Sequence, residues 1–289
     1  MSSSKRVWTV LSMLEWATGY FEEKNVHSPR MSIEWLLADV LQVKRLDLYL
    51  QYDRPLSVEE LDKIRPMVKR RASHEPLQYI TGYTDFMSAT FRVTPDVLIP
   101  RPETEQLVEI VLEQFRDQST APVSLLDIGT GSGCIPVSIK KTYTEWYCAG
   151  MDISAKALQI ARENAAANET EIDFFEADLL NIQNHSDISG RNWDIIISNP
   201  PYITNDEKDA LDPQVIDFEP PLALFHDSPV TLYKKIAEFA ASQKASLFLE
   251  INDSLVQDIY DTIASLYKIV NQACDLDGNK RFIIAGKPV

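Results

Sequence analysis

The chain has 289 residues and a mass of 32.8 kDa, a length that suits two domains better than one or three. Hydrophobic residues make up 45% of the sequence and charged residues 25%, which excludes a disordered, fibrous or coiled-coil protein. The formal net charge of −15 lies wholly in residues 91–289, because residues 1–90 hold 12 basic and 12 acidic side chains. This sign disfavours a surface that binds nucleic acid directly, although acidity can also serve solubility alone.

The first part of the chain has the pattern of a helical bundle. Its apolar residues recur at three- and four-residue spacing, as in Val10, Leu11, Leu14 and in Ile33, Leu36, Leu37. Ser57 with Glu60 forms a capping-box pattern that opens a further helix, and Pro66 is expected to kink that helix or to begin a new turn. The basic cluster at residues 69–71 is interpreted as a solvated helix face, with a partner contact as the alternative. We predict a helical domain over residues 1–83 with no chemistry of its own.

Residues 84–104 break this helical pattern. Phenylalanine and valine among threonine and serine predict a short hairpin that links two domains. The segment Arg101-Pro-Glu103 is interpreted equally well as an interdomain hinge or as an element that closes over cofactor or substrate, so both charged residues are candidate substrate ligands. An amphipathic helix is predicted over residues 105–118.

From residue 123 onward, apolar strand patterns alternate with helical patterns. The predicted strands cover residues 123–128, 146–151, 172–175, 194–198, 246–251, 267–270 and 281–285, and a helix covers residues 155–167. Short apolar runs separated by helices predict an α/β domain, over residues 105–289, whose parallel sheet is covered on both faces. The closely spaced last two strands predict an antiparallel edge.

A glycine-rich turn directly follows the first strand of this domain. It comprises Gly129, Thr130, Gly131, Ser132 and Gly133. Glycine allows a sharp turn and a close approach of a ligand to the main chain. In open α/β sheets, nucleotides bind at the carboxyl ends of the strands. Asp152 ends the next strand, where a carboxylate can accept hydrogen bonds from both ribose hydroxyls. The pattern predicts a nucleotide-containing cofactor, and its alternative is a tight turn without a ligand.

The loop also indicates which cofactor it holds. Its spacing is GxGxG, whereas the dinucleotide fingerprint is GxGxxG and brings a pyrophosphate onto a helix N-terminus. Asp127 beside the loop would repel a pyrophosphate but suits the cationic amino-acid end of S-adenosylmethionine. Asp178, followed by Leu179, ends the third strand and is placed to receive the amine of adenine. We therefore predict S-adenosylmethionine as cofactor, with S-adenosylhomocysteine as product.

The most specific motif is Asn199-Pro200-Pro201-Tyr202, which ends the fourth predicted strand. Prolines cannot extend the ladder and hold the neighbouring carbonyls rigidly. The Asn199 side-chain oxygen and the Pro200 carbonyl can accept both N–H bonds of a planar NH2 group, while Tyr202 adds a flat face. Such acceptors would position a weakly nucleophilic nitrogen toward a methyl sulfonium and stabilise the charge that develops on it. The motif predicts methyl transfer to a conjugated amine, and its alternative is a plain Pro-Pro turn.

Other catalytic groups are not indicated. The four histidines are dispersed, so we predict no metal site, and three scattered cysteines predict no disulfide framework and a cytoplasmic location. No apolar run reaches about 18 residues, so we expect no membrane association. The N-terminal stretch lacks the cleavage site of an export signal.

Four segments together resemble the HemK/PrmC family of release factor glutamine N5-methyltransferases. They are residues 76–82 and 94–105 in the interdomain region, 127–133 in the cofactor loop and 199–202 in the amide motif. The resemblance implies a five-helix N-terminal domain that recognises the substrate protein and a Rossmann-like class I methyltransferase domain with a seven-stranded mixed sheet.

By this resemblance the substrate is the glutamine of the Gly-Gly-Gln motif in peptide chain release factors, whose methylation modulates translation termination. The resemblance also implies cofactor contacts from residues 129–133, Asp152, Asp178, Leu179 and Asn199, whereas residues 199–202 hold the glutamine. Two positions depart from the family pattern. Leu179 replaces a common aromatic residue that would stack on adenine, and Pro221 replaces a frequent basic residue.

Two other functions remain open at this point. The Asn-Pro-Pro-Tyr motif is shared with N6-adenine DNA methyltransferases, whose flipped base would present the same NH2 group. The acidity of residues 91–289 and the lack of an evident target-recognition domain count against that function. The second alternative is a catalytically silent module that binds release factors through its helical domain. We expect the protein to be a monomer.

Overall fold

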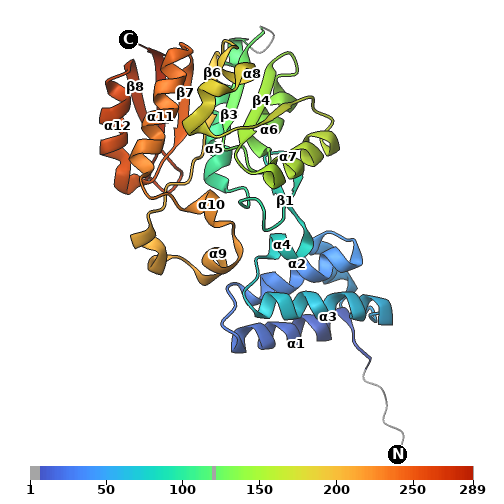
Figure 1. Cartoon of the computed structure of the whole chain (residues 1–289). Helices are drawn as coiled ribbons and strands as arrows, with labels where there is room; N and C mark the ends of the chain where they lie inside the picture. The colour runs from blue at the N-terminus through green and yellow to red at the C-terminus, as the bar shows by residue number, and fades with distance from the viewer. Residues whose placement is uncertain (1–6, 119–121, 289) are drawn as a thin grey trace, which may run out of the picture. The chain divides into compact units, whose positions relative to one another are not determined.

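The computed structural model describes residues 7–118 and 122–288, and the chain divides into two compact units (Figure 1). The first unit comprises residues 1–82 and 212–218, and the second comprises residues 83–211 and 219–289. The domains predicted from the sequence are continuous segments, so they did not assign residues 212–218 to the first unit. They also placed the hairpin in a separate linker. In the structure the hairpin belongs to the second unit.

The first unit is helical around an apolar core. Its elements are α1 (Val10–Glu23), α2 (Pro29–Leu41), the 3-10 helix η1 (Arg45–Gln51), α3 (Val58–Ala72), α4 (Leu77–Thr81) and α9 (Pro213–Phe218). Val10, Leu14 and Ile33 are fully buried in its core. The predicted capping box opens α3, where Ser57 and Glu60 bond to each other's backbone N–H. The helix then runs on through Pro66, so the predicted new turn there is wrong.

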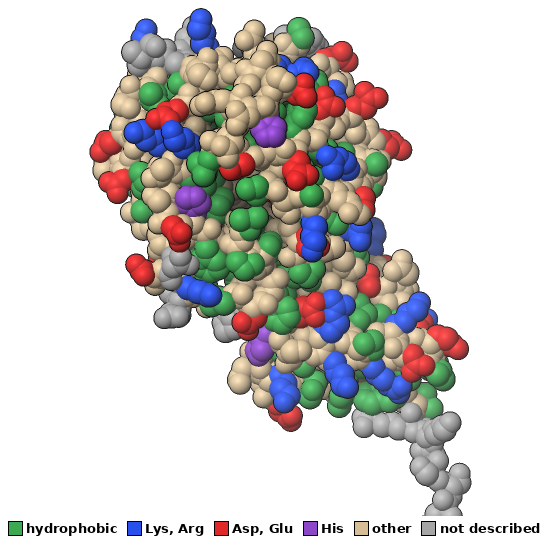
Figure 2. All heavy atoms as spheres, in the orientation of Figure 1, with side chains coloured by type: hydrophobic (Ala, Val, Ile, Leu, Met, Phe, Trp, Pro, Cys, Tyr) green, Lys and Arg blue, Asp and Glu red, His purple; other side chains and the backbone are tan. Residues whose placement is uncertain are grey.

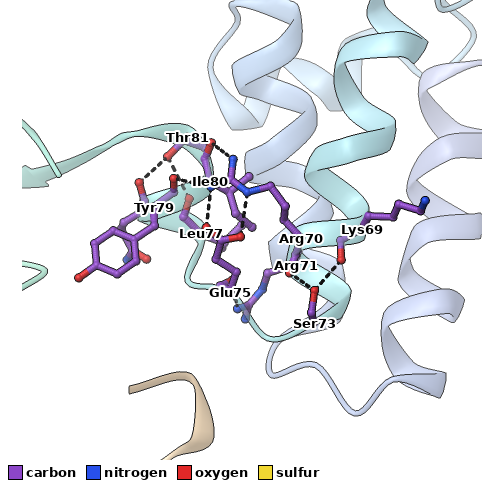
Figure 3. Close-up of polar contacts among 10 residues, drawn as sticks. Lys69, Arg70, Arg71, Ser73, Glu75, Leu77, Tyr79, Ile80 and Thr81 are labelled. Atoms are coloured by element: carbon purple, nitrogen blue, oxygen red, sulfur yellow. Dashed lines mark hydrogen bonds and ion pairs between the residues drawn. The ribbon is translucent and has the colours of Figure 1, made fainter. Parts of the chain in front are cut away.

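Two of the three basic residues at the end of α3, Arg70 and Arg71, form hydrogen bonds within this unit (Figure 3). Arg70 forms a bidentate ion pair with Glu75, with N–O distances of 2.6 and 2.8 Å, and also donates to carbonyls of α4. Arg71 is only 4% exposed and donates to Ser32 Oγ at 3.1 Å and to Gln214 Oε1 at 3.1 Å. The interpretation of this cluster as a solvated helix face is therefore wrong for Arg71, whereas Lys69 and Arg70 are exposed.

The second unit contains the sheets. A hairpin pairs β1 (Tyr83–Phe86) with β2 (Ala89–Arg92), as predicted. The larger sheet contains β3 (Ser124–Ile128), β4 (Tyr147–Asp152), β5 (Asp173–Glu176), β6 (Ile195–Ser198), β7 (Ser246–Glu250), β8 (Tyr267–Cys274) and β9 (Lys280–Pro288). Its order is β5-β4-β3-β6-β7-β9-β8, and β9 pairs antiparallel with both of its neighbours whereas the other pairs are parallel. This is the expected mixed seven-stranded sheet.

Helical segments connect these strands. They are α5 (Pro102–Gln114), η2 (Arg116–Gln118), α6 (Cys134–Thr142), α7 (Ala155–Ala167), η3 (Leu179–Asn184), α8 (Ser186–Ser189), η4 (Asn205–Ala210), α10 (Pro221–Leu224), α11 (Pro229–Ser242), η5 (Asp253–Leu255) and α12 (Val256–Ala264). Successive strand residues face opposite sides, so Leu126 packs with α11 and α12, whereas Leu125 packs with α5 and α6. The sheet thus has an apolar core on each face, and Figure 1 shows helices flanking it.

The strand order reverses between β3 and β6. From β3 the chain proceeds outward through β4 to β5, then returns to β6 on the other side of β3 and continues to β7. In open α/β sheets, ligands bind beyond the carboxyl ends of the strands at such a switch point. The residues that follow β3 and β6 are therefore the first place to look for a site.

Candidate active site

The two principal sequence motifs meet at this switch point. The glycine-rich turn follows β3, and the Asn-Pro-Pro-Tyr motif follows β6, its parallel neighbour. The buried Ser198 hydroxyl donates to the Ile128 carbonyl at 2.6 Å, which ties the two strand ends together. The structure therefore brings the predicted cofactor loop and the predicted amide site to one edge of the sheet.

The glycine loop has the backbone conformation that its composition predicts. Gly129, Gly131 and Gly133 have φ angles of +75°, +53° and +79°, in the left-handed region that favours glycine. A Cβ atom on Gly129 or Gly131 would meet no atom within 4 Å, so the space beside them is open to a ligand. The loop is anchored from behind, since Asn164 Nδ2 on α7 donates to the Ser132 carbonyl at 2.9 Å. Gly133 then caps the N-terminus of α6.

Asp152 stands at the end of β4, next to this loop. Its carboxylate accepts from the backbone N–H groups of Gly131 and Ser154, both at 2.9 Å. Burial raises the pKa of Asp152, and these backbone donors lower it. Each carboxylate oxygen keeps capacity for a further hydrogen bond. A ligand with two neighbouring hydroxyls, as in a ribose, fits this group.

Asp127, in β3, carries the unusual electrostatics of the site. Its side chain is fully buried, and neither carboxylate oxygen has a partner of good hydrogen-bond geometry among the described residues. Burial raises its pKa to about 7, the nearby Thr130 hydroxyl lowers it in part, and the charge of Asp152 raises it further. Buried carboxyl groups normally have a hydrogen-bond partner, so the position of Asp127 requires an explanation. A cationic ligand in the loop would neutralise the Asp127 carboxylate. The two carboxylates are acceptors that fit the ammonium and ribose of S-adenosylmethionine and disfavour a pyrophosphate.

The predicted adenine contact has a structural task as well. Asp178 caps η3, where its two oxygens accept from the Leu180 backbone N–H and from Asn181 Nδ2, both at 2.9 Å. Leu179 is half-buried and packs against the core of that sheet face. Asp178 therefore retains acceptor capacity for an amine, and Leu179 offers an aliphatic surface where the family pattern has an aromatic one.

The Asn-Pro-Pro-Tyr segment is held by residues that the sequence analysis missed. Asn199 Nδ2 donates to Thr104 Oγ1 at 3.0 Å, and the Thr104 hydroxyl donates to Glu250 Oε2 at 2.7 Å. Tyr202 reaches the other oxygen of Glu250 at 3.4 Å, and Pro200 is buried. One signal could have found Glu250, since it is an acid that ends an apolar strand, as Asp152 is.

Arg101 and Glu103 flank the start of α5. Arg101 pairs through Nη2 with Glu219 Oε1 at 2.5 Å, and Glu219 is only 3% exposed. Glu103 lies in the first turn of α5, one residue before Thr104, and its charge raises the pKa of Glu250. The structure thus places both residues beside the support of the amide motif.

Residues 7–118 and 122–288 contain few groups suited to metal or thiol catalysis. The described residues contain no group of three or more potential metal ligands. The three cysteines are free thiols, and burial raises the pKa of Cys134 and of Cys148 to about 12, which keeps both protonated and unreactive. None of the described helices has the length and hydropathy of a bilayer-crossing segment.

Comparison with known proteins assigns the fold to a class. A model of the methyltransferase small domain matches residues 104–216, and a model of the PrmC N-terminal domain matches residues 12–82. The T. thermophilus 16S rRNA N2 G1207 methyltransferase, solved with AdoMet and guanosine, superposes with a TM-score of 0.52 over 71% of this chain and 49% of its own, at 16% identity. The second unit is therefore a class I methyltransferase fold.

The curated relatives define the family more narrowly. The release factor glutamine methyltransferase of Leptospira interrogans is 36% identical over 96% of this chain and 97% of its own length. That of Geobacter sulfurreducens is 39% identical over 78% and 76%. The chain belongs to the release factor glutamine methyltransferase family and is an enzyme of the transferase class.

Proposed function

We propose that this enzyme transfers a methyl group from S-adenosylmethionine to N5 of the glutamine in the Gly-Gly-Gln motif of peptide chain release factors, and so modulates translation termination. The observation that carries the proposal is the meeting of the glycine loop and Asn199 at the ends of paired strands β3 and β6. One motif fits the methyl donor, and the other fits a planar amide.

The residues of the chain divide this work between them. Asp127 and Asp152 would hold the ammonium and ribose of the donor, and residues 129–133 would let it approach the main chain. S-adenosylmethionine, when bound, supplies a methyl group activated by a sulfonium. Asn199 Oδ1 and the Pro200 carbonyl would accept both N–H bonds of the glutamine amide, which orients its nitrogen and stabilises the charge that develops there.

Tyr202 would cover the flat face of the amide. Burial raises the pKa of Tyr202 well above its usual range, and the charge of Glu250 raises it further, so its hydroxyl stays protonated. The tyrosine therefore provides a surface and a neutral donor and is not suited to act as a base. No strong base is required if the amide proton leaves after the methyl group arrives.

The test compares substrates directly. Release factors purified from cells that lack the enzyme, free ribosomal proteins and duplex DNA are incubated with the enzyme and S-adenosylmethionine, and the products are analysed by mass spectrometry. We expect one added methyl group on the Gly-Gly-Gln glutamine. Methylation of adenine in DNA without methylation of the release factor would refute the proposal, as would binding of the release factor without transfer.

The remaining features of the proposal concern the setting of the reaction. We propose a monomer that acts in the cytoplasm on the free release factor and does not bind nucleic acid directly. The excess of acidic residues in residues 91–289 supports the last point. In the face shown in Figure 2, charged side chains of both signs are scattered, without a continuous basic area among the described residues.

A further inference from the structure

Behind the Asn199 amide lies a relay of hydrogen bonds that joins three elements of the second unit. Asn199 follows β6, Thr104 lies in the first turn of α5, and Glu250 ends β7. The Nδ2–Oγ1 distance is 3.0 Å and the Oγ1–Oε2 distance is 2.7 Å. Thr104 is 3% exposed and Glu250 is 1% exposed, so solvent has little access to the bond between these two side chains.

The direction of this relay follows from counting hydrogens. A threonine hydroxyl has one hydrogen to donate, and an ionised carboxylate can only accept. The hydrogen of Thr104 is therefore directed to Glu250, and Thr104 Oγ1 can only accept from the amide. An Asn199 side chain rotated by 180° would set its oxygen against Oγ1, so two acceptors would face each other. Among the described residues, Asn199 Oδ1 has no hydrogen-bond donor of its own.

We propose that Thr104 and Glu250 are positioning residues, which fix the Asn199 amide so that Oδ1 is presented to an N–H of the substrate. The inference rests on the proposed role of Asn199 as an acceptor and adds the residues that decide whether it presents an oxygen or a nitrogen. Without the relay, the two orientations of the amide would differ little in energy. The side chain would then rotate, so that Oδ1 would rarely lie at the substrate N–H in the geometry that transfer requires.

The charge on Glu250 controls the relay. Its surroundings are the Tyr202 hydroxyl at 3.4 Å, the Tyr233 hydroxyl on its backbone carbonyl at 2.9 Å, and the charges of Arg281 and Glu103. Burial raises the pKa of Glu250 to about 7, whereas its hydrogen-bond donors and Arg281 lower it and Glu103 raises it. A protonated Glu250 can donate to Thr104, which frees the threonine hydrogen for the rotated amide. Protonation thus permits the unproductive orientation.

The first experiment substitutes the middle of the relay. Thr104→Val keeps the shape of the side chain and removes the hydroxyl, whereas Thr104→Ser keeps the hydroxyl. We expect Thr104→Val to lower kcat about 10- to 100-fold, the range typical for loss of a residue that orients a reacting group. Thr104→Ser should restore most of the rate. Thr262→Val is the matched control, because among the described residues the Thr262 hydroxyl bonds only to the Asp258 carbonyl of its own helix.

A double-mutant cycle separates positioning from a general structural effect. If Thr104 acts through Asn199, Thr104→Val should cause no further loss of kcat in an Asn199→Ala background. At saturating S-adenosylmethionine, kcat of the wild type should decrease as the pH falls below about 7. Glu250→Gln should have a lower kcat that does not show this decrease. An unchanged kcat in Thr104→Val, equal losses in the Val and Ser variants, or additive losses in the cycle would each overturn the proposal.

A readout without substrate keeps the inference distinct from the proposed function. The side-chain amide resonances of Asn199, assigned by their loss in Asn199→Ala, are followed by NMR as the pH of the donor-free enzyme is varied. We expect a titration near pH 7 that disappears in Glu250→Gln and in Thr104→Val. Absence of this titration in the wild type would refute the relay. Its presence in an enzyme that fails to methylate release factors would refute only the proposed function.

Discussion

The backbone N–H of Gly131 donates to a carboxylate oxygen of Asp152 at 2.9 Å, so the acid at the end of β4 also holds the loop that follows β3. Asp152, which is predicted to bind the ribose, therefore already supports the loop when no cofactor is bound. Substitution of Asp152 should therefore weaken binding of S-adenosylmethionine in two ways, because a contact is lost and because the loop becomes less ordered.

We expect Asp152→Ala to weaken binding of S-adenosylmethionine by about 1–3 kcal/mol, the usual cost of leaving a hydrogen-bonding group without its partner. Isothermal titration calorimetry measures the dissociation constant. Asp258→Asn, on the exposed side of α12, is the control. Equal affinities in Asp152→Ala and the wild type would show that Asp152 does not bind the ribose.

Asn199→Ala should fold normally and lose on the order of 10² to 10³ in kcat, by analogy with the loss of one preorganised polar group. The physical reason is the removal of one of two acceptors that hold the reacting nitrogen. Single-turnover methylation of a release factor measures the rate, and circular dichroism checks the fold. A variant as fast as the wild type would contradict the two-acceptor mechanism.

The pH dependence of stability should reveal the buried Asp127. Its pKa in the folded, donor-free enzyme is about 7, raised from an ordinary value of 3.8. Between these values the folded state keeps a proton that the unfolded state has lost, so the contribution to the free energy of unfolding falls as pH rises. The slope is at most about 1.4 kcal/mol per pH unit for one group.

Urea unfolding of the wild type and of Asp127→Asn between pH 4 and 7 measures this contribution. The variant should show a shallower decline, with the remaining slope assigned in part to Glu250, which also has a raised pKa. Parallel curves for the two proteins would show that Asp127 titrates normally in the folded state.

Gly150 in β4 should be sensitive to the smallest substitution. A Cβ atom there would lie 2.7 Å from Thr130 Oγ1, 2.9 Å from Thr130 Cβ and 3.0 Å from Phe174 Cε1. Gly150→Ala should therefore displace the cofactor loop and lower both the melting temperature and the affinity for S-adenosylmethionine. Gly286→Ala in β9 is the matched control, because its Cβ would meet no atom within 4 Å. Equal melting temperatures and affinities in the two variants would show that the loop accommodates the added Cβ atom without loss of stability or binding.

The Arg101–Glu219 ion pair should contribute to stability. Arg101→Gln leaves the Glu219 carboxylate buried without its partner, and we expect a loss of about 1–3 kcal/mol in unfolding free energy. Adding Glu219→Gln should recover part of it, because the stranded charge is then removed. A melting temperature unaffected by Arg101→Gln, together with a raised KM for the release factor, would instead identify Arg101 as a substrate ligand.

The sequence predicted the sheet well because buried parallel strands are short apolar runs and their ends carry polar residues. All seven strands of the larger sheet were found, and α7 covers the predicted residues 155–167. The local rule for proline failed at one position, within α3. Pro66 lies on an exposed face of α3, where water can satisfy the carbonyl that loses its donor, so the helix continues.

The support of the amide site could not be predicted from spacing. Thr104 and Glu250 are 146 positions apart, and only the packing of α5 against β7 brings their side chains together. The burial of Arg71 at the end of α3 has the same cause, since this side chain is held by a residue 143 positions away. The sequence predicts residues that would contact ligands, and it missed Thr104 and Glu250, which hold Asn199.

The excursion of residues 212–218 into the helical unit limits how this enzyme can be dissected. Removing residues 1–82 would not release an intact catalytic domain, because α9 belongs to the helical unit and Gln214 would lose Arg71. The truncated protein would carry a loose, partly apolar loop that begins ten residues after Tyr202. A minimal catalytic fragment would therefore also need residues 212–218 replaced by a short polar turn between Leu211 and Glu219.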